Sequence, residues 1–164
     1  MQTIDFISTE PSLFHSLITF GPDEPEVVLS AMHARRSSAT RPHFWNRLAQ
    51  DPPPSSVLWL VMGDLNTVTS DKEKSGGRPI RLAHCTTFSN FVNTTSPIDL
   101  GFSGSLYTWD NGCPGVNRIQ ERLDRVLTNP TLLQLYPHTQ VTHLPKLYSD
   151  HCPILVDLCP NRPL

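Results

Sequence analysis

The sequence predicts a layered α/β sandwich, and three observations lead to this fold class. An apolar run at 57–62 is hydrophobic on both of its faces, as expected of a central strand that is covered on both sides. Short strand-like and helix-like segments alternate along the 164 residues without the regular rhythm of a doubly wound fold. The 16 prolines favour turns and short elements over long helices. A chain of this length fits one domain.

Local patterns predict the individual elements. Apolar or alternating runs predict strands, weakly at 5–7 and 17–20, and more clearly at 27–32, 57–62, 106–109, 122–127 and 152–158. Apolar residues at helical spacing predict helices at 41–50, 86–92 and 130–136. Phe88 and Phe91 are expected to face inward from the second helix. Proline, glycine and charge predict turns and loops at 21–25, 51–56 and 71–79.

Composition excludes several classes of protein. The net charge of −2 gives no overall support for nucleic-acid binding. A local basic cluster suits either a solvated surface or phosphate contact: Arg35, Arg36, Arg41 and Arg47. No apolar run of membrane-spanning length and no signal peptide is present. The four cysteines lack metal-site spacing and are expected to be reduced thiols of a nuclear or cytoplasmic protein, whose oligomeric state is left open.

The first polar motif follows the apolar run at 57–62 directly. Asp64 and Asn66 lie two residues apart, so strand alternation places them on the same side of the chain. A carboxylate and an amide in this arrangement can share a metal ion or an attacking water. The structural alternative is an Asx-turn that ends the strand.

The second motif is Ser149-Asp150-His151, immediately before the last apolar strand. His151 is a candidate general acid or base, or a phosphate contact, and Asp150 is a candidate metal ligand. A serine-protease triad is a poor explanation, because its three side chains must converge from separate segments. The structural alternative is a polar loop that caps the strand.

The third motif is Arg122-Leu123-Asp124, in an otherwise apolar strand. An unpaired carboxylate there would be costly, so Asp124 needs a partner. A histidine is the expected partner, because an Asp–His pair fixes the tautomer and raises the basicity of the ring. The alternative is a surface ion pair with Arg122 or Arg125.

The order and spacing of these three motifs resemble the endonuclease/exonuclease/phosphatase superfamily, which includes DNase I-like and apurinic-site nucleases. Longer strings between 27 and 158 resemble the endonuclease domains of plant LINE-type retrotransposons. They are Asp99-Leu100-Gly101-Phe102-Ser103-Gly104, Tyr107-Thr108-Trp109, Glu121-Arg122-Leu123-Asp124-Arg125, Thr142-His143-Leu144-Pro145 and Ser149-Asp150-His151-Cys152-Pro153-Ile154. The resemblance implies a DNase I-like layered α/β sandwich of two mixed β-sheets flanked by helices. It also implies metal-dependent hydrolysis of phosphodiester bonds in DNA.

The resemblance implies a role for each matched residue. Asp64 would orient or activate the attacking water, and Asn66 would help to hold the transition-state phosphate. Asp124 would pair with His151, which would contact the scissile phosphate. Asp150 would serve a Mg²⁺ or Mn²⁺ site, consistent with hard oxygen ligands.

Two further positions are expected to face the substrate. Trp109 belongs to a hairpin that would lie near the DNA, although core packing explains this residue equally well. His33 stands where the family usually has a catalytic tyrosine at the end of a strand.

The first 26 residues match the family weakly. The family begins with one strand that carries a metal-site asparagine and a second that carries a metal-binding glutamate. Glu10, Glu24 and Glu26 lie in turn-like sequence instead. We therefore expect an N-terminally truncated domain at 27–158, after a weakly patterned segment at 1–26 and before a tail at 159–164. The alternatives to an active nuclease are a non-catalytic retroelement remnant that at most binds nucleic acid or protein and, less favoured by the LINE-like strings, a small-molecule phosphatase.

Overall fold

A six-stranded mixed sheet forms the centre of the computed structural model, which describes residues 3–10, 13–34, 41–81 and 85–160. Its strands run in the order β1-β2-β3-β4-β10-β6. The pairs β1–β2, β2–β3, β4–β10 and β10–β6 are antiparallel, and β3–β4 is parallel. The bounds of these strands are Thr3–Glu10, Leu13–Thr19, Val27–His33, Leu58–Asp64, Asp124–Thr128 and Ile98–Asp99, in that order along the sheet.

Two smaller sheets complete the β-structure. One is mixed and has the order β12-β11-β7, and the other is antiparallel and has the order β5-β9-β8. The bounds are Ile154–Asp157 for β12, Gln140–His143 for β11, Ser103–Gly104 for β7, Lys74–Ser75 for β5, Gln120–Glu121 for β9 and Trp109–Asp110 for β8. The predicted layered sandwich with two mixed sheets is confirmed, with a small third sheet added.

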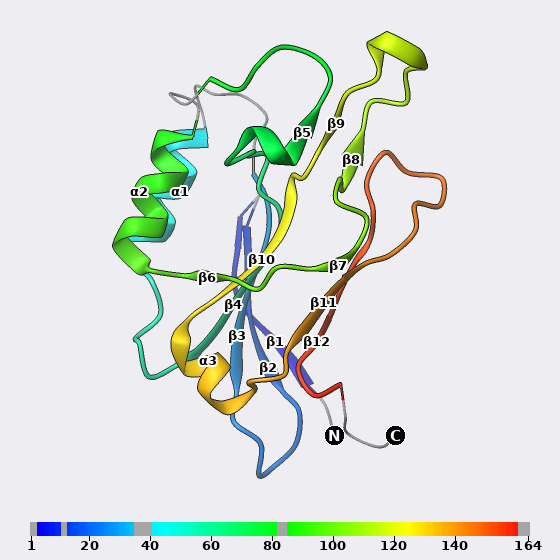
Figure 1. Ribbon diagram of the computed structural model, residues 1–164. Helices are drawn as coiled ribbons and strands as arrows, with labels where there is room; N and C mark the ends of the chain where they lie inside the picture. Colours follow the sequence, from blue (N-terminus) through cyan, green and yellow to red (C-terminus); the bar gives the residue numbers. More distant parts are fainter. Residues whose placement is uncertain (1–2, 11–12, 35–40, 82–84, 161–164) are drawn as a thin grey trace.

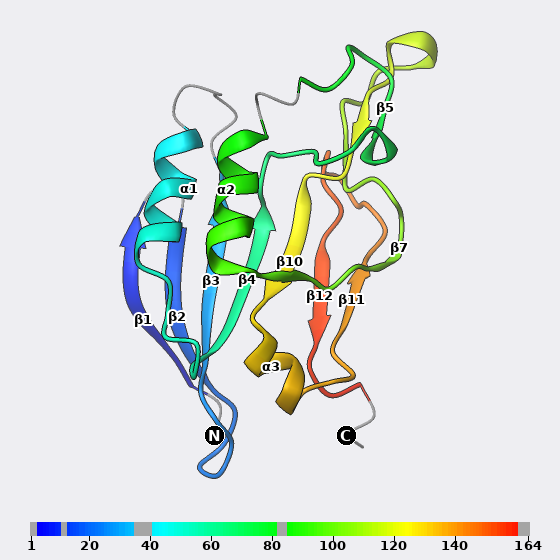
Figure 2. The same ribbon diagram turned by 60° about the vertical axis from the view of Figure 1, so that its left-hand side comes forward.

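Helices cover one face of the large sheet, and the β12-β11-β7 sheet lies beyond its other face (Figure 1). Helices α1 (Arg41–Gln50) and α2 (Thr86–Thr95) lie side by side, and the short α3 (Pro130–Leu135) lies at one end of the sheets (Figure 2). The short 3-10 helices η1 (Asp71–Glu73) and η3 (Gly115–Asn117) lie in connections. No helix among the described residues is long and apolar enough to cross a bilayer.

Strand β4 buries both faces, which explains its continuous apolar sequence. Trp59 and Val61 contribute to the core under α1 and α2, together with Trp45, Phe88 and Phe91. Leu58 and Leu60 contribute instead to the core between the sheets, together with Val27, Val126, Leu132, Tyr136 and Val141. The prediction that Phe88 and Phe91 face inward is confirmed, since both are buried in the first core.

The structure differs from the sequence prediction in several segments. Residues 3–10 and 13–19 form two full strands of the large sheet, where only short strands at 5–7 and 17–20 were expected. Residues 106–108 were expected to continue a strand, but the ladder begins at Trp109. Thr108 bonds two neighbours instead, donating its N–H to Glu121 and accepting from Cys152. The side chains of the basic cluster at 35, 36, 41 and 47 lie outside the described part of the chain.

Candidate active site

The candidate site lies at the ends of three neighbouring strands of the large sheet. His33 ends β3, Asp64 ends β4, and Asp124 begins β10. The pairing register sets both His33 and Asp124 directly opposite Asp64. Residues opposite one another in paired strands project to the same face, so the three side chains stand in one row. His33 Nε2 lies 3.4 Å from Asp64 Oδ2.

A tight turn fixes Asp64 at the end of β4. Gly63 has φ +131°, and a Cβ there would lie 2.0 Å from the carbonyl oxygen of Met32 in β3, so only glycine fits this position. Asp64 Oδ1 accepts the backbone N–H of Asn66 at 2.8 Å. The Asx-turn that was the structural alternative is therefore present. It does not exclude a functional role, because an ionised carboxylate keeps further lone pairs to accept a water.

The side-chain amide nitrogen of Asn66 uses both of its hydrogens inside the site. Its Nδ2 donates to the carbonyl oxygen of Ala34 at 2.6 Å and to Asp64 Oδ2 at 2.8 Å. An amide nitrogen carries only two hydrogens. A hydrogen bond from Asn66 to a phosphate would therefore require one of these bonds to break. In this arrangement Asn66 positions Asp64 and joins the ends of β3 and β4.

Burial raises the pKa of Asp64 above its ordinary value. The nearby charge of Asp124 raises it further, whereas the N–H of Asn66 and the two histidines His151 and His33 lower it. A carboxyl with a raised pKa is a better proton acceptor than an ordinary one.

Asp124 pairs with His151, and this arrangement decides between the two alternatives for its partner. His151 Nδ1 lies 2.9 Å from Asp124 Oδ2, and the side chains are 30% and 9% exposed, respectively. The hydrogen bond to Asp124 is the main cause that raises the pKa of His151, against the opposing effect of burial. The expected Asp–His pair is confirmed. Because Nδ1 is engaged, the other ring nitrogen, Nε2, is the one left to meet a substrate.

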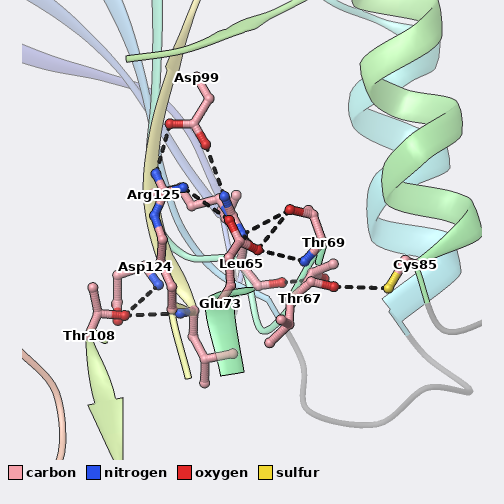
Figure 3. Close-up of polar contacts among 12 residues, drawn as sticks. Leu65, Thr67, Thr69, Glu73, Cys85, Asp99, Thr108, Asp124 and Arg125 are labelled. Atoms are coloured by element: carbon pink, nitrogen blue, oxygen red, sulfur yellow. Dashed lines mark hydrogen bonds and ion pairs between the residues drawn. The ribbon is translucent and has the colours of Figure 1, made fainter. Parts of the chain in front are cut away.

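The two arginines beside Asp124 bind other carboxylates, and Figure 3 shows Arg125 between Asp99 and Glu73. Arg122 donates to Glu73 at 3.1 Å and to Asp99 at 2.8 Å. Arg125 donates to Asp99 at 2.9 Å and also pairs closely with Glu73. Burial alone would raise the pKa of Glu73, but Arg125 holds it at about 2. This network ties η1 and β6 to the start of β10, where Asp124 lies.

Thr108 positions the start of β10. Its side-chain oxygen accepts the backbone N–H groups of Leu123 and Asp124, both at 3.0 Å (Figure 3). Its own carbonyl accepts the N–H of Cys152 at 2.7 Å. Thr108 is fully buried. One residue thus holds Asp124 and the segment that follows His151 at a fixed separation.

Asp150 and Trp109 lie beside this row. The indole Nε1 of Trp109 donates to Asp150 Oδ2 at 2.9 Å, and the backbones of Trp109 and His151 form an isolated antiparallel bridge. Asp150 also contributes to the raised pKa of His151. The predicted residues of the three motifs, together with His33 and Trp109, therefore gather in one region. Their catalytic and binding roles stay predictions.

The described residues do not form a metal site by themselves. Among them there is no group of three or more histidine, cysteine, aspartate or glutamate side chains that could hold an ion. Both oxygens of Asp64 accept hydrogen bonds from Asn66, and Asp124 is engaged by His151. The Mg²⁺ or Mn²⁺ implied by the resemblance would need oxygen ligands beyond this set. Magnesium binds weakly to one or two carboxylates unless phosphate oxygens complete its shell.

A basic groove opens next to Asn66 and Trp109. Its volume is about 560 Å³, and its wall includes Lys74, Arg78 and Arg81. Lys74 pairs with Glu121, which also lines the groove. Arg78 and Arg81 are exposed. We call this the Arg78 groove.

Sequence reasoning missed the residues that support the site. Thr108 carried no polar-motif signal, and Glu73 was assigned to a charged loop. Arg122 and Arg125 were considered only as partners of Asp124. The two arginines in the apolar segment 122–127 were the available signal. Buried arginines require carboxylate partners, so they indicated that acidic residues such as Glu73 and Asp99 lie nearby.

The fold and this arrangement define a class of protein: a layered α/β sandwich with an Asp–His pair and a second aspartate at the ends of adjacent central strands. A sequence model of the Endonuclease/Exonuclease/phosphatase family matches residues 4–151. The chain belongs to this family. The match includes both β1 and β2, which lie in the segment that the sequence analysis left outside the partial domain.

Solved structures with the same fold include several nucleases. The endonuclease domain of TRAS1, a telomere-specific non-LTR retrotransposon, has a TM-score of 0.66 and 17% identity, covering 97% of this chain and 70% of that one. The AP endonuclease LMAP from Leishmania major has a TM-score of 0.63 and 16% identity, covering 90% and 54%. The APE2 catalytic domain from Xenopus laevis has a TM-score of 0.59 and 16% identity, covering 88% and 54%. The chain thus spans about half the length of the last two. A search of curated protein sequences found no match.

Proposed function

We propose that this chain hydrolyses phosphodiester bonds in DNA, as a retrotransposon-type endonuclease. The observation that carries the proposal is the Asp124–His151 pair beside the Asp64–Asn66 turn. The Asp124–His151 pair would supply a cationic hydrogen-bond donor for a phosphate. The Asp64–Asn66 turn would supply a carboxylate that accepts a hydrogen bond from the attacking water. Phosphodiester hydrolysis uses a base for the attacking water and a donor that stabilises the charge developing on the phosphate.

Each side chain has a role that its contacts allow. Protonated His151 would donate from Nε2 to a non-bridging oxygen of the scissile phosphate, while Asp124 stabilises the imidazolium through Nδ1. Asp64 would accept a proton from the attacking water, which its raised pKa favours. His33, whose Nε2 lies 3.4 Å from Asp64 Oδ2, would add a second contact to the phosphate on the other side of the row.

The Arg78 groove supports DNA as the substrate. Arg78 and Arg81 offer two exposed guanidinium groups next to the site, although the net charge of the chain is −2. Arginine binds phosphate by paired, charge-assisted hydrogen bonds. A DNA strand with its scissile phosphate at His151 would therefore have neighbouring phosphates within reach of this groove.

A second candidate function is DNA binding without cleavage. It is favoured by the finding that the described residues contain no group of three metal-ligating side chains. Under this alternative the Arg78 groove and His151 would hold DNA, but the phosphate would lack the additional positive charge that hydrolysis requires.

The two functions are separated by measuring nicking and binding together. Nicking of supercoiled plasmid with Mg²⁺ is compared between the wild type, His151→Ala and His138→Ala, the last an exposed control. Binding of a labelled oligonucleotide is measured in EDTA. Wild-type nicking that EDTA blocks and that falls about 100-fold or more in His151→Ala supports the endonuclease. Binding without any nicking selects the second candidate.

A further inference from the structure

A second groove lies next to the candidate site, between the loop at 110–118 and the loop at 146–150 that leads to His151. It has a volume of about 790 Å³ and is lined by loop residues of 110–118 and 146–150. Asp150 of the candidate site lies in its wall. We call it the Tyr148 groove, after the aromatic residue that also lines it.

Tyr148 is fully exposed and has a strained backbone. Its relative exposure is 109%, the highest of the large hydrophobic residues. Its φ is +58°, a region that bulky residues rarely occupy and that costs about 1–3 kcal/mol. No packing of the ring offsets this strain, because the side chain is surrounded by solvent. An exposed, strained aromatic side chain is a feature that binding, rather than folding, accounts for.

The position of Tyr148 links it to the proposed reaction. Tyr148 is three residues before His151, so their Cα atoms are at most about 11 Å apart. This upper limit corresponds to about three nucleotides of duplex rise, so Tyr148 lies within one to three nucleotides of a phosphate at His151. A strand whose scissile phosphate contacts His151 would thus bring a neighbouring nucleotide to Tyr148.

The wall of the Tyr148 groove carries two basic and two acidic side chains, and two of the four form an ion pair. Arg118 is held by Asp110 through two hydrogen bonds, at 2.8 and 2.6 Å. Asp150 is engaged by the indole of Trp109 at 2.9 Å. Lys146, in the same wall, is the basic side chain outside the Arg118–Asp110 pair and is partly exposed, with the carboxylate of Asp150 as its counter-charge in that wall. An aromatic face beside an ammonium group suits a base and its phosphate.

We propose that Tyr148 and Lys146 form a subsite for an unpaired nucleotide next to the scissile phosphate, with the base stacked on the Tyr148 ring. The inference rests on the proposed function for its substrate class and adds a preference to it. In a fully paired duplex the face of a base is covered by its neighbours, whereas an unpaired base offers its face to the ring. This chain should therefore prefer DNA with unpaired bases beside the cut.

The test measures binding in EDTA, so that it does not depend on cleavage. Affinities for a fully paired duplex and for the same duplex with a two-nucleotide bulge are compared by fluorescence anisotropy. The variants are Tyr148→Ala, Tyr148→Phe and Tyr148→Gly. Leu147→Ala is the matched control, because Leu147 is the 74% exposed neighbour in the same loop.

The wild type should bind the bulged duplex more tightly than the paired one. Tyr148→Ala should weaken binding to the bulged DNA by about 5- to 100-fold and abolish the preference, while Tyr148→Phe and Leu147→Ala keep it. Tyr148→Gly should lose affinity as Tyr148→Ala does, with no loss of thermal stability, because glycine tolerates the positive φ. Equal binding of both duplexes by the wild type, unchanged affinity in Tyr148→Ala, or an equal loss in Leu147→Ala would each overturn the subsite. A chain that shows this binding pattern without nicking keeps the subsite and loses the endonuclease.

Discussion

At the scale of single residues, the central interaction is the hydrogen bond between Asp124 and His151. It raises the pKa of the imidazole and leaves Nε2 as the free donor. Replacing Asp124 with Asn removes the charge but keeps the size of the side chain. We therefore expect the pKa of His151 to fall in Asp124→Asn, as followed by NMR titration of the ring. His138, which is exposed, serves as the internal reference. An unchanged His151 titration would show that Asp124 does not hold the imidazolium.

The raised pKa values of Asp64 and His151 together predict the pH dependence of activity. In the proposed reaction, Asp64 must be ionised to accept a proton, and His151 must be protonated to bind phosphate. The pKa values of both groups are raised. Nicking should therefore fall on the acid side as Asp64 gains a proton and on the alkaline side as His151 loses one. In Asp124→Asn the alkaline limb should move to lower pH. A profile whose alkaline limb stays in place in this variant would rule out His151 as its cause.

At the scale of elements, Thr108 joins the small β5-β9-β8 sheet to the start of β10. Thr108→Val keeps the shape of the side chain but removes the oxygen that accepts two buried N–H groups. Each unsatisfied donor costs about 1–3 kcal/mol, so this variant should lose about 2 kcal/mol or more of its free energy of unfolding in urea. Thr108→Ser retains the oxygen and should lose less. Equal losses in the two variants would mean that packing of the methyl group, not the hydroxyl, matters.

The bounds of strands and helices could be predicted where a continuous apolar run or a helical apolar pattern sets them. The runs at 27–32 and 57–62 and the helix at 41–50 agree closely with β3, β4 and α1, because their apolar residues pack on a covered sheet. Strand β1 mixes polar and apolar residues in Thr3–Glu10, so its pattern is weak, although it pairs with β2, the next strand in the sequence. The missing strand at 106–108 reflects tertiary bonds of Thr108 that no local pattern encodes.

Some residues of the candidate site could also be predicted from local sequence, and others could not. Asp64, Asp124 and His151 could be found because polar residues at strand ends are conspicuous. The use of both hydrogens of the Asn66 amide could not be predicted, since it depends on the carbonyl of Ala34, 32 positions away in the chain. Likewise, Tyr148 becomes noticeable only through its exposure and its positive φ.

At the scale of the whole molecule, the Glu73 network connects loops and strands that are far apart in sequence. The pKa of Glu73 in the folded chain, about 2, lies below the ordinary value of 4.5. A carboxyl with a depressed pKa stabilises the fold above its unfolded pKa, and this contribution is lost as the pH falls through the folded value. Glu73 should thus contribute roughly 3 kcal/mol at neutral pH, lost between about pH 5 and pH 2.

Glu73→Gln tests this contribution by urea unfolding at several pH values. The variant should be less stable at neutral pH, because Arg122 and Arg125 lose the negative charge of the buried Glu73 carboxylate. Its stability should also change less between pH 5 and pH 2 than that of the wild type. Asp71→Asn, at an exposed position of the same 3-10 helix, should retain the wild-type slope. An identical slope in Glu73→Gln would assign the acid sensitivity to other carboxyls.

The central claim is that the Asp124–His151 pair and Asp64 hydrolyse phosphodiester bonds in DNA. Nicking of supercoiled plasmid by the wild type and by His151→Ala tests it most directly, with Mg²⁺ and with EDTA. We expect Mg²⁺-dependent conversion to the open circular form, reduced about 100-fold or more in His151→Ala and unchanged in His138→Ala. Plasmid that stays supercoiled with the wild type, or nicking that His151→Ala leaves at the wild-type rate, would contradict it.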